Sequence, residues 1–284
     1  MTSAADWTGR VGNVWAAEWQ RTDRSLADLA VHLDAAIAHV APDTGRALDI
    51  GCGAGGTSLA LAAARPGLAI TGIDLSEELV AVARERLAER YRLDPAATQV
   101  RFCAGDAVAL AQAEEPVDLI VSRHGLMFFP DPVAALAAIR AATTDVATLV
   151  FSCFDARARN RFATIADDMT HVAVPPPAGY SPGPFAFSDP RQVAAWLTTA
   201  GWHDAEFRQV AFDYVAGEGS DPVADAISFL SRIGAAARPL AEATITDRET
   251  MLARLSAALA GHRVGNRLLL PASAWIWRAN ASGR

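Results

Sequence analysis

Residues 46–57, Arg-Ala-Leu-Asp-Ile-Gly-Cys-Gly-Ala-Gly-Gly-Thr, read as a short buried strand that passes through a glycine-rich turn into a helix. Residues 70–74, Ile-Thr-Gly-Ile-Asp, read as the next strand, which ends on a carboxylate. In a parallel sheet this order places backbone N–H groups and an acidic side chain at one edge, where α/β folds bind nucleotide-like ligands. The turn therefore predicts both a fold class and the position of a ligand site.

The chain around this turn alternates between strand and helix patterns. Strand patterns occupy residues 47–50, 69–73, 100–103, 119–122 and 148–154, followed by 205–212 and 274–279. Helical patterns separate them at residues 57–64, 77–90, 132–142 and 189–201. Such alternation is typical of α/β proteins, and it predicts a Rossmann-like, seven-stranded, mostly parallel sheet with helices on both faces.

The remaining segments define the expected domain organisation. Residues 11–40 are helical in pattern, and we expect two pieces broken near Thr22 and Asp23, with Ser25 capping the second. We predict an N-terminal helical lid over residues 1–45 and an α/β domain formed by residues 46–212 and 264–284. The alanine-rich residues 213–263 read as a helical insertion that contributes to a substrate pocket.

Charge and composition exclude several classes of function. The chain contains no lysine, because all 25 basic residues are arginine, and this rules out Schiff-base chemistry and a Walker-type phosphate lysine. The formal net charge of −7 comes without any basic block. Nucleic-acid binders need a positive surface to displace counterions from phosphates, so we expect no nucleic-acid partner.

Membrane and metal binding are also not expected. No apolar run approaches the roughly 18 residues of a membrane span, and the first residues lack the pattern of a signal peptide, so we expect a cytoplasmic location. The cysteines Cys52, Cys103 and Cys153 lie far apart, and the six histidines show no HExxH pairing. We therefore expect buried thiols and no metal site.

The carboxylates around the glycine turn narrow the choice of ligand. Residues 51–56 fit the GxGxxG pattern of dinucleotide sites, and Asp74 lies at about the right distance, so an NAD-dependent dehydrogenase is one interpretation. However, Asp49 lies two residues before the first glycine, where it would repel a pyrophosphate and attract a cationic ligand. Asp106, just past the third strand, supplies another carboxylate where an adenine edge would lie.

Together these residues resemble the class I S-adenosylmethionine-dependent methyltransferases. Residues 49–55 match the first motif of that family, Asp74 its ribose-binding acidic residue, and Asp106 its adenine-binding acidic position. The chain is most similar to a bacterial subgroup related to the ubiquinone and menaquinone methyltransferases. This similarity includes residues 15–24, 122–132, 183–190 and 270–275, whereas residues 143–148 lack the Pro-Gly-Gly turn that is common in the family.

The resemblance implies S-adenosyl-L-methionine as cofactor and S-adenosyl-L-homocysteine as product. Gly51 and Gly53 would approach the amino-acid portion of the donor, Asp49 would attract its ammonium, Asp74 would accept both ribose hydroxyls, and Asp106 would accept the adenine amino group. We also assign Cys52, Gly55, Leu75, Ala107 and Arg123 to the donor site. Trp15 and Trp19, with Trp7 further back, are candidates for a lid whose indole faces attract the sulfonium, or for plain helix packing.

The acceptor side is less specific. His124 follows the fourth strand and is the candidate general base if the acceptor is a hydroxyl, although a packing or orienting role is the alternative. Met127, Phe128 and Tyr180 are candidates for lining the substrate site. Arg157 is a candidate for binding an acidic acceptor, and an exposed position at the start of a helix is the alternative.

These observations predict an enzyme that methylates a small or medium-sized organic acceptor, with O-methylation favoured over N- or C-methylation. Three alternatives remain at this point: an NAD-dependent dehydrogenase, a non-catalytic S-adenosylmethionine-binding module, and a donor-binding enzyme with another chemistry. We expect a small-molecule acceptor as the partner, neither nucleic acid nor membrane, and a chain that is compatible with a homodimer.

Overall fold

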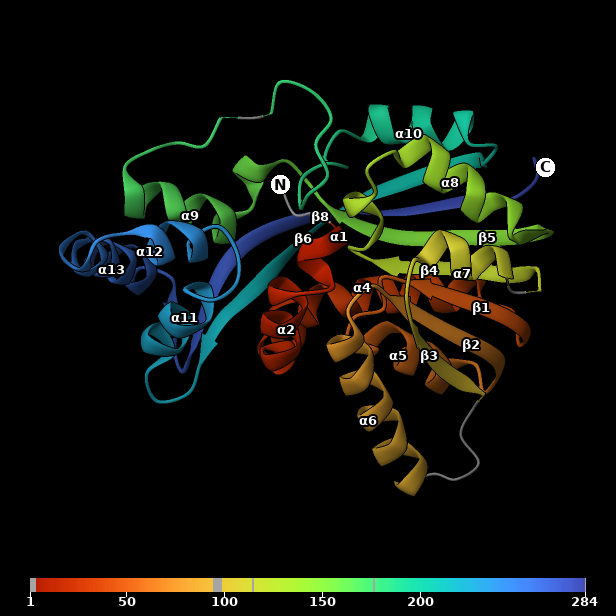
Figure 1. The fold of residues 1–284 in the computed structure, drawn as a ribbon, viewed down its shortest axis with the longest axis horizontal. Helices are drawn as coiled ribbons and strands as arrows, with labels where there is room; N and C mark the ends of the chain where they lie inside the picture. Colours follow the sequence, from red (N-terminus) through yellow and green to blue (C-terminus); the bar gives the residue numbers. More distant parts are fainter. Residues whose placement is uncertain (1–3, 94–98, 114, 176, 284) are drawn as a thin grey trace.

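The central sheet sets the position of every element near the glycine turn (Figure 1). The computed structural model describes residues 4–93, 99–113, 115–175 and 177–283. Among these residues the strands follow the order β3-β2-β1-β4-β5-β8-β6, and β7 pairs with β8. The strands are β1 (Thr44–Ile50), β2 (Gly67–Asp74), β3 (Val100–Ala104), β4 (Val117–Arg123), β5 (Thr143–Phe154), β6 (His203–Glu218), β7 (Arg263–Val264) and β8 (Arg267–Asn280).

The first five strands are parallel, and β8 runs antiparallel between β5 and β6. This arrangement confirms the predicted Rossmann-like, mostly parallel sheet. The described sheet contains an eighth strand that the sequence analysis missed, because β7 has only two residues and therefore carries no periodic pattern. The strands β6 and β8 are also far longer than the expected 205–212 and 274–279, because they pair with each other along nearly their whole length.

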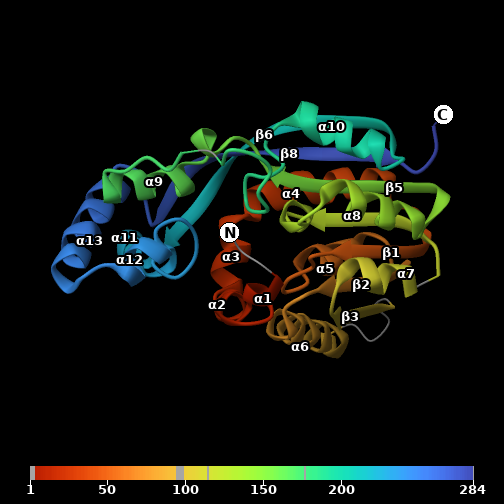
Figure 2. The ribbon, with the colours of Figure 1, turned by 45° about the horizontal axis from the view of Figure 1, so that its top comes forward.

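Helices cover both faces of the sheet (Figure 2). One face is covered by α4 (Ala27–Val40), α5 (Gly56–Ala64) and α6 (Glu77–Leu93), and the other by α7 (Ala107–Ala113), α8 (Pro132–Ala141) and α10 (Pro190–Thr199). Because both faces are covered, the last four residues of β1 are all buried, including the carboxylate of Asp49. A polar side chain in such a strand needs a partner or a function.

Among the described residues, three helices begin at an Asp-Pro pair, which is a start signal that the sequence itself shows. Proline suits the first helical position, where its missing N–H costs nothing, and the preceding aspartate caps the free N–H groups. At α8 the carboxylate of Asp131 accepts a hydrogen bond from the N–H of Ala134. The carboxylate of Asp189 accepts from the N–H of Arg191 at α10, and that of Asp221 from the N–H of Ala224 at α11 (Pro222–Leu230).

The N-terminal segment forms more helices than expected. It contains α1 (Ala4–Trp7), α2 (Arg10–Ala17) and α3 (Trp19–Ser25), so the predicted break near Thr22 and Asp23 is wrong. The breaks occur at Glu18 and Leu26, and Ser25 does not cap α4, since its hydroxyl donates to the carbonyl of Thr22 within α3. Glu18 is buried and forms ion pairs with Arg21 and Arg232, a long-range contact that periodicity alone does not reveal.

The ribbon of β6 and β8 extends beyond the sheet and carries a second group of helices, which Figure 1 shows on the left. We call α9 (Arg161–Thr170), α11, α12 (Ala237–Glu242) and α13 (Ile245–Ala260) the outer helices. The expected boundary between residues 212 and 213 falls inside β6, because the strand continues to Glu218 before α11 begins. In both views α1–α3 lie between the outer helices and the first strands of the sheet.

Within the described ranges, no helix combines the length and the apolar character that crossing a lipid bilayer requires.

Candidate active site

The glycine turn between β1 and α5 has a backbone that only glycine adopts easily. Gly51, Gly53 and Gly55 have φ angles of +68°, +52° and +81°, in the left-handed region. A Cβ at Gly51 would lie 2.8 Å from the Cα of Gly125, whereas a Cβ at Gly53 would meet no atom of the described residues within 4 Å. The turn is therefore packed against the end of β4 on one side and open at Gly53.

Asp49 lies beside this open turn, completely buried at the end of β1. One carboxylate oxygen accepts a hydrogen bond of 2.6 Å from the hydroxyl of Ser58, and the other, Oδ1, has no partner among the described residues. Burial raises the pKa of Asp49 to about 6, although the Ser58 hydrogen bond opposes this shift. A buried carboxylate with an unused oxygen is suited to a cationic group of a ligand.

Asp74 supplies a second carboxylate at the end of β2. Its two oxygens accept N–H groups of Gly53 and Ser76, each at 2.9 Å, so the turn and the start of α6 hold it in place. Burial raises the pKa of Asp74, while these backbone hydrogen bonds lower it. Each oxygen keeps a further lone pair for a ligand hydroxyl. Leu75 follows as a partly buried residue.

The predicted residues Cys52 and Asp106 have clear structural roles. The N–H groups of Gly51 and Cys52 both donate to the carbonyl of Ile73, which fastens the turn to β2, and burial raises the pKa of the Cys52 thiol. Asp106 is exposed, and its Oδ1 accepts the N–H of Ala109 at 2.9 Å, capping α7, which begins at Ala107. Binding of an adenine by Asp106 stays a prediction.

The N-terminal tryptophans pack against different parts of the protein. Trp7 lies 5.6 Å from Trp15 and 5.2 Å from Phe128 between ring centroids, so α1 contacts both α2 and the segment that follows β4. Trp19 has the guanidinium of Arg86 over its ring, 4.3 Å from the centroid. One face of Trp19 is therefore already in contact with a cation of the protein.

Arg123, the last residue of β4, forms an ion pair that the sequence analysis missed. Its Nη2 lies 2.6 Å from Oδ1 of Asp23 in α3, and Oδ2 of the same carboxylate lies 3.0 Å from Nη1 of Arg86 in α6. About one hundred residues separate Asp23 from Arg123, and although Asp23 lies in the family-like segment 15–24, no sequence pattern pairs it with Arg123 or Arg86. Only the fold brings these three side chains together over the glycine turn.

His124 follows Arg123 with an unusual backbone, since its φ angle is +61° and its N–H donates to the carbonyl of Ser152. Its ring is stacked on Phe154 at a centroid distance of 4.0 Å. Both ring nitrogens are buried and have no partner among the described residues. Burial lowers the pKa of His124 to about 3, with a smaller contribution from the charge of Arg123, so the imidazole is neutral at pH 7.

The ring of His124 belongs to a series of stacked or tilted aromatic rings that we call the aromatic wall: His124, Phe154, Phe162, Phe185 and Tyr214. Phe154 lies 4.9 Å from Phe162, which lies 4.5 Å from Tyr214. The sequence analysis missed Phe154, Phe162 and Tyr214, because they come from β5, α9 and β6 and share no local pattern. Met127 is buried, and its carbonyl accepts the N–H of Gly183, which brings the loop before Phe185 to the end of β4.

Two predicted substrate residues have protein partners instead. Both terminal nitrogens of Arg157 donate to the carboxylate of Asp167 in α9, at 2.7 and 2.6 Å. The hydroxyl of Tyr180 donates to the carbonyl of Phe129 at 2.6 Å, and its ring packs on Trp196 of α10. In this conformation both functional groups are held by protein partners.

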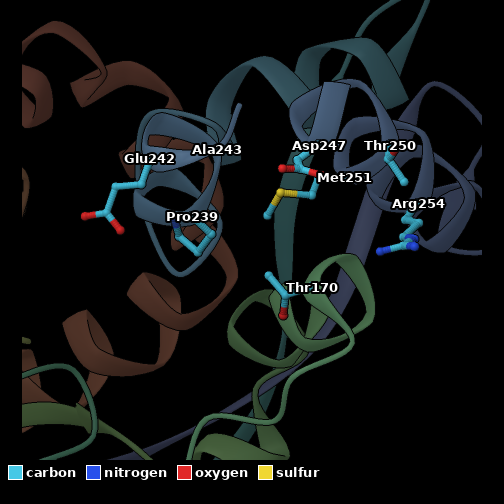
Figure 3. Close-up of a pocket in the computed structure, with 8 residues that line it drawn as sticks. All are labelled: Thr170, Pro239, Glu242, Ala243, Asp247, Thr250, Met251 and Arg254. Carbon is cyan, nitrogen blue, oxygen red and sulfur yellow. The ribbon is translucent and has the colours of Figure 1, made fainter. Parts of the chain in front are cut away.

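A cavity of about 410 Å³ lies elsewhere, among the outer helices (Figure 3). It is lined by Thr170, Pro239, Glu242, Ala243, Asp247, Thr250, Met251 and Arg254. A second cavity of about 340 Å³ lies against the beginning of the first strands, near Arg46 and Gln99. None of the unpartnered buried polar atoms of the described residues lines either cavity, whereas Asp49 and His124 both carry such atoms at the carboxyl ends of β1 and β4. We therefore place the candidate active site at the glycine turn.

The chain matches the methyltransferase domain family over residues 43–205, from just before β1 to the beginning of β6. The chain belongs to this family. Its relatives identify it as a class I S-adenosylmethionine-dependent methyltransferase related to the quinone methyltransferases, which confirms the predicted enzyme class. These matches do not support the two alternative interpretations, an NAD-dependent dehydrogenase and a non-catalytic S-adenosylmethionine-binding module.

Two curated relatives illustrate this similarity. Ubiquinone biosynthesis O-methyltransferase of Xanthomonas campestris pv. campestris is 35% identical over 175 residues, which cover 60% of this chain and 67% of that protein. Demethylmenaquinone methyltransferase of Renibacterium salmoninarum is 28% identical over 182 residues, which cover 60% of this chain and 72% of that protein.

Among solved structures, Haemonchus contortus phosphoethanolamine N-methyltransferase 2 in complex with S-adenosyl-L-methionine shares the fold. The TM-score is 0.54 at 17% identity, covering 100% of this chain and 61% of that chain. The residues of the glycine turn fit the same cofactor here. The unused oxygen of Asp49 suits its ammonium, the open space at Gly53 leaves room for its amino-acid portion, and the lone pairs of Asp74 suit its ribose.

Proposed function

We propose that this methyltransferase O-methylates a neutral, ring-containing organic acceptor that binds against the aromatic wall. The observation that carries this proposal is the series of stacked rings beginning at His124, directly after the strand that ends beside the glycine turn. Aromatic faces bind planar apolar groups well, and they provide no counter-charge for an acidic acceptor. The Xanthomonas relative, an O-methyltransferase of ubiquinone biosynthesis, supports the same class of acceptor.

On this proposal the residues around the turn bind and orient the donor. Asp49 attracts its ammonium, Asp74 accepts its ribose hydroxyls, and Arg123 binds its carboxylate. S-adenosylmethionine supplies an activated methyl group on a sulfonium, so the protein has mainly to align the acceptor oxygen with that methyl and exclude water. Trp7, which contacts Phe128, and Trp15, which contacts Trp7, are placed to close the site against solvent.

We also propose that residues 1–45 act as a lid and that residues 213–263 contribute to the acceptor pocket. Tyr214 belongs to the aromatic wall, and Arg24 of α3 lies 2.7 Å from Asp225 of α11, so the N-terminal helices and the outer helices meet beside the wall.

Calorimetry provides the first test. We expect the protein to bind S-adenosylhomocysteine with micromolar or tighter affinity and to show no measurable binding of NAD, because Asp49 repels a pyrophosphate. With labelled S-adenosylmethionine, we expect label transfer to phenolic acceptors and none to aliphatic carboxylic acids. Transfer to a carboxylate or an amine instead would refute the proposed acceptor class while leaving the enzyme class intact.

A substitution of His124 tests whether this residue binds the acceptor hydroxyl by a hydrogen bond or removes its proton. A neutral imidazole with a low pKa and no carboxylate behind it among the described residues is a hydrogen-bonding group rather than a strong base. We expect His124→Phe, which keeps the stack on Phe154, to lower kcat/KM by about tenfold and to leave the pH profile unchanged, as expected for one lost neutral hydrogen bond. A loss of roughly 10²–10⁴-fold together with a lost pH limb would instead identify a general base.

A further inference from the structure

The carboxylate of Asp23 lies between two arginines at the start of α5. It contacts Arg123 at 2.6 Å and Arg86 at 3.0 Å, and all three side chains are partly buried. The same arginine nitrogen of Arg86 donates to the carbonyl of Ala54 in the glycine turn at 2.6 Å. These contacts join the N-terminal helix α3 to the turn through the side chains of Asp23 and Arg86.

The guanidinium of Arg123 is thereby held at the first residue of α5. A Cβ at Gly56 would lie 3.2 Å from Nη2 of Arg123 and 3.4 Å from Oδ1 of Asp23. The N-cap residue of this helix is Gly55, which has no side chain to cap the first N–H groups, and a helix N-terminus is favourable for an anion. The unused oxygen of Asp49, which suits a cation, lies at the end of the strand before the same turn. A cationic and an anionic group on one turn match an amino-acid zwitterion.

We propose that Asp23 is a positioning residue that holds Arg123 in place for the carboxylate of the donor. This inference rests on the proposed placement of the donor. Asp23 occupies only Nη2 of Arg123, so Nη1 and Nε, which have no hydrogen-bond partner among the described residues, remain for a second carboxylate. Arginine binds carboxylates through such pairs of N–H groups.

The neighbours of Arg123 explain why it needs a positioning residue. The charge of Arg123 lowers the pKa of both Asp34 and Asp49, which burial otherwise raises, so both carboxyl groups lie within its electrostatic reach. An Arg123 released from Asp23 is expected to turn toward one of them. A turn toward Asp49 would occupy the oxygen that the ammonium needs.

A different role for Asp23 would be only to fasten the lid. Helix α3 is fastened on its other side as well, since Arg24 lies 2.7 Å and Arg21 3.4 Å from Asp225 of α11. Asp225 therefore offers a matched control, because Asp225→Asn removes ion pairs of the same helix without touching Arg123.

The experiment compares two ligands by calorimetry on the full chain. S-adenosylhomocysteine carries the amino acid, and 5′-methylthioadenosine lacks both its carboxylate and its ammonium. We expect Asp23→Asn to weaken S-adenosylhomocysteine by about tenfold or more and to change methylthioadenosine by less than about twofold, because a charge-assisted carboxylate contact is lost. Asp225→Asn is expected to change neither affinity by more than about twofold.

The Arg123→Gln variant completes the test. It should show the same selective loss, and the double variant with Asp23→Asn should bind no more weakly than Arg123→Gln alone, since the two residues act as a unit. Equal weakening of both ligands by Asp23→Asn would show a fastening role only, and unchanged or tighter binding of S-adenosylhomocysteine would also overturn the inference. If the wild-type chain binds neither ligand, the proposed function fails first, which is a distinguishable result.

Discussion

Replacing Gly53 with alanine is expected to abolish binding of S-adenosylhomocysteine while the protein remains folded. The φ angle of +52° costs an alanine about 1–2 kcal/mol, but the new methyl group would meet no atom of the described residues within 4 Å. It would instead fill the space that we assign to the amino-acid portion of the donor. Calorimetry should therefore show at least a hundredfold loss of affinity, with a melting temperature only a few degrees lower.

Gly51→Ala is the matched variant, and it should show a different pattern. Its φ angle of +68° carries a similar backbone cost, but the added Cβ would lie 2.8 Å from the Cα of Gly125, where neither backbone can move freely. We expect this variant to lose roughly 2–4 kcal/mol of unfolding free energy. If Gly53→Ala binds S-adenosylhomocysteine as well as the wild type does, the donor does not lie against this turn.

Asp49→Asn is expected to stabilise the ligand-free protein and to weaken donor binding. The folded pKa of about 6 lies above the value of 3.8 for an unperturbed aspartate, so the folded state favours the protonated form. Above pH 6 the ionised carboxylate therefore lowers the unfolding free energy by its full amount. This destabilisation decreases as the pH falls from 6 toward 3.8. Removing the charge should raise the unfolding free energy by about 1–2 kcal/mol at pH 7.5. This figure allows for a weaker hydrogen bond between Ser58 and the amide than between Ser58 and the carboxylate.

The increase in the unfolding free energy caused by Asp49→Asn should approach zero as the pH approaches 4. Denaturant titrations at several pH values would measure this change. Binding of S-adenosylhomocysteine has the opposite dependence, since only the ionised carboxylate attracts the ammonium. We expect the wild-type affinity to fall as the pH drops below about 6 and the affinity of Asp49→Asn to be lower throughout and independent of pH in that range. An Asp49→Asn protein that is less stable at pH 7.5 would show that the carboxylate has a structural role.

The acceptor side shows where sequence reasoning reaches its limit. Arg157 follows a strand and Tyr180 lies in a loop near the expected pocket, so the sequence makes both candidates. In the structure, however, Arg157 pairs with Asp167 and Tyr180 with the carbonyl of Phe129. Phe162 and Tyr214, in contrast, carry no local signal and come together only because the long ribbon of β6 returns past α9. A side chain that follows a strand points toward the site only if no nearer partner binds it.

The conformation of the glycine turn could largely be predicted from the sequence. The positive φ angles of Gly51, Gly53 and Gly55, the buried strand before them and the carboxylate of Asp74 follow from interactions within about thirty residues. A tight turn between a buried strand and a helix has few allowed backbone conformations. Its local sequence therefore specifies the conformation and the direction of its N–H groups.

By itself the sequence determined the parallel sheet, the glycine turn and the carboxylates at its edge, because backbone conformation and burial pattern are properties of short segments. Only the tertiary structure decided that Asp23 pairs with Arg123 and Arg86, that His124 is neutral and stacked on Phe154, and that α3 is bounded at Glu18 and Leu26. The charge state and orientation of these side chains depend on neighbours that are distant in the chain, and their desolvation is set by the whole packed fold.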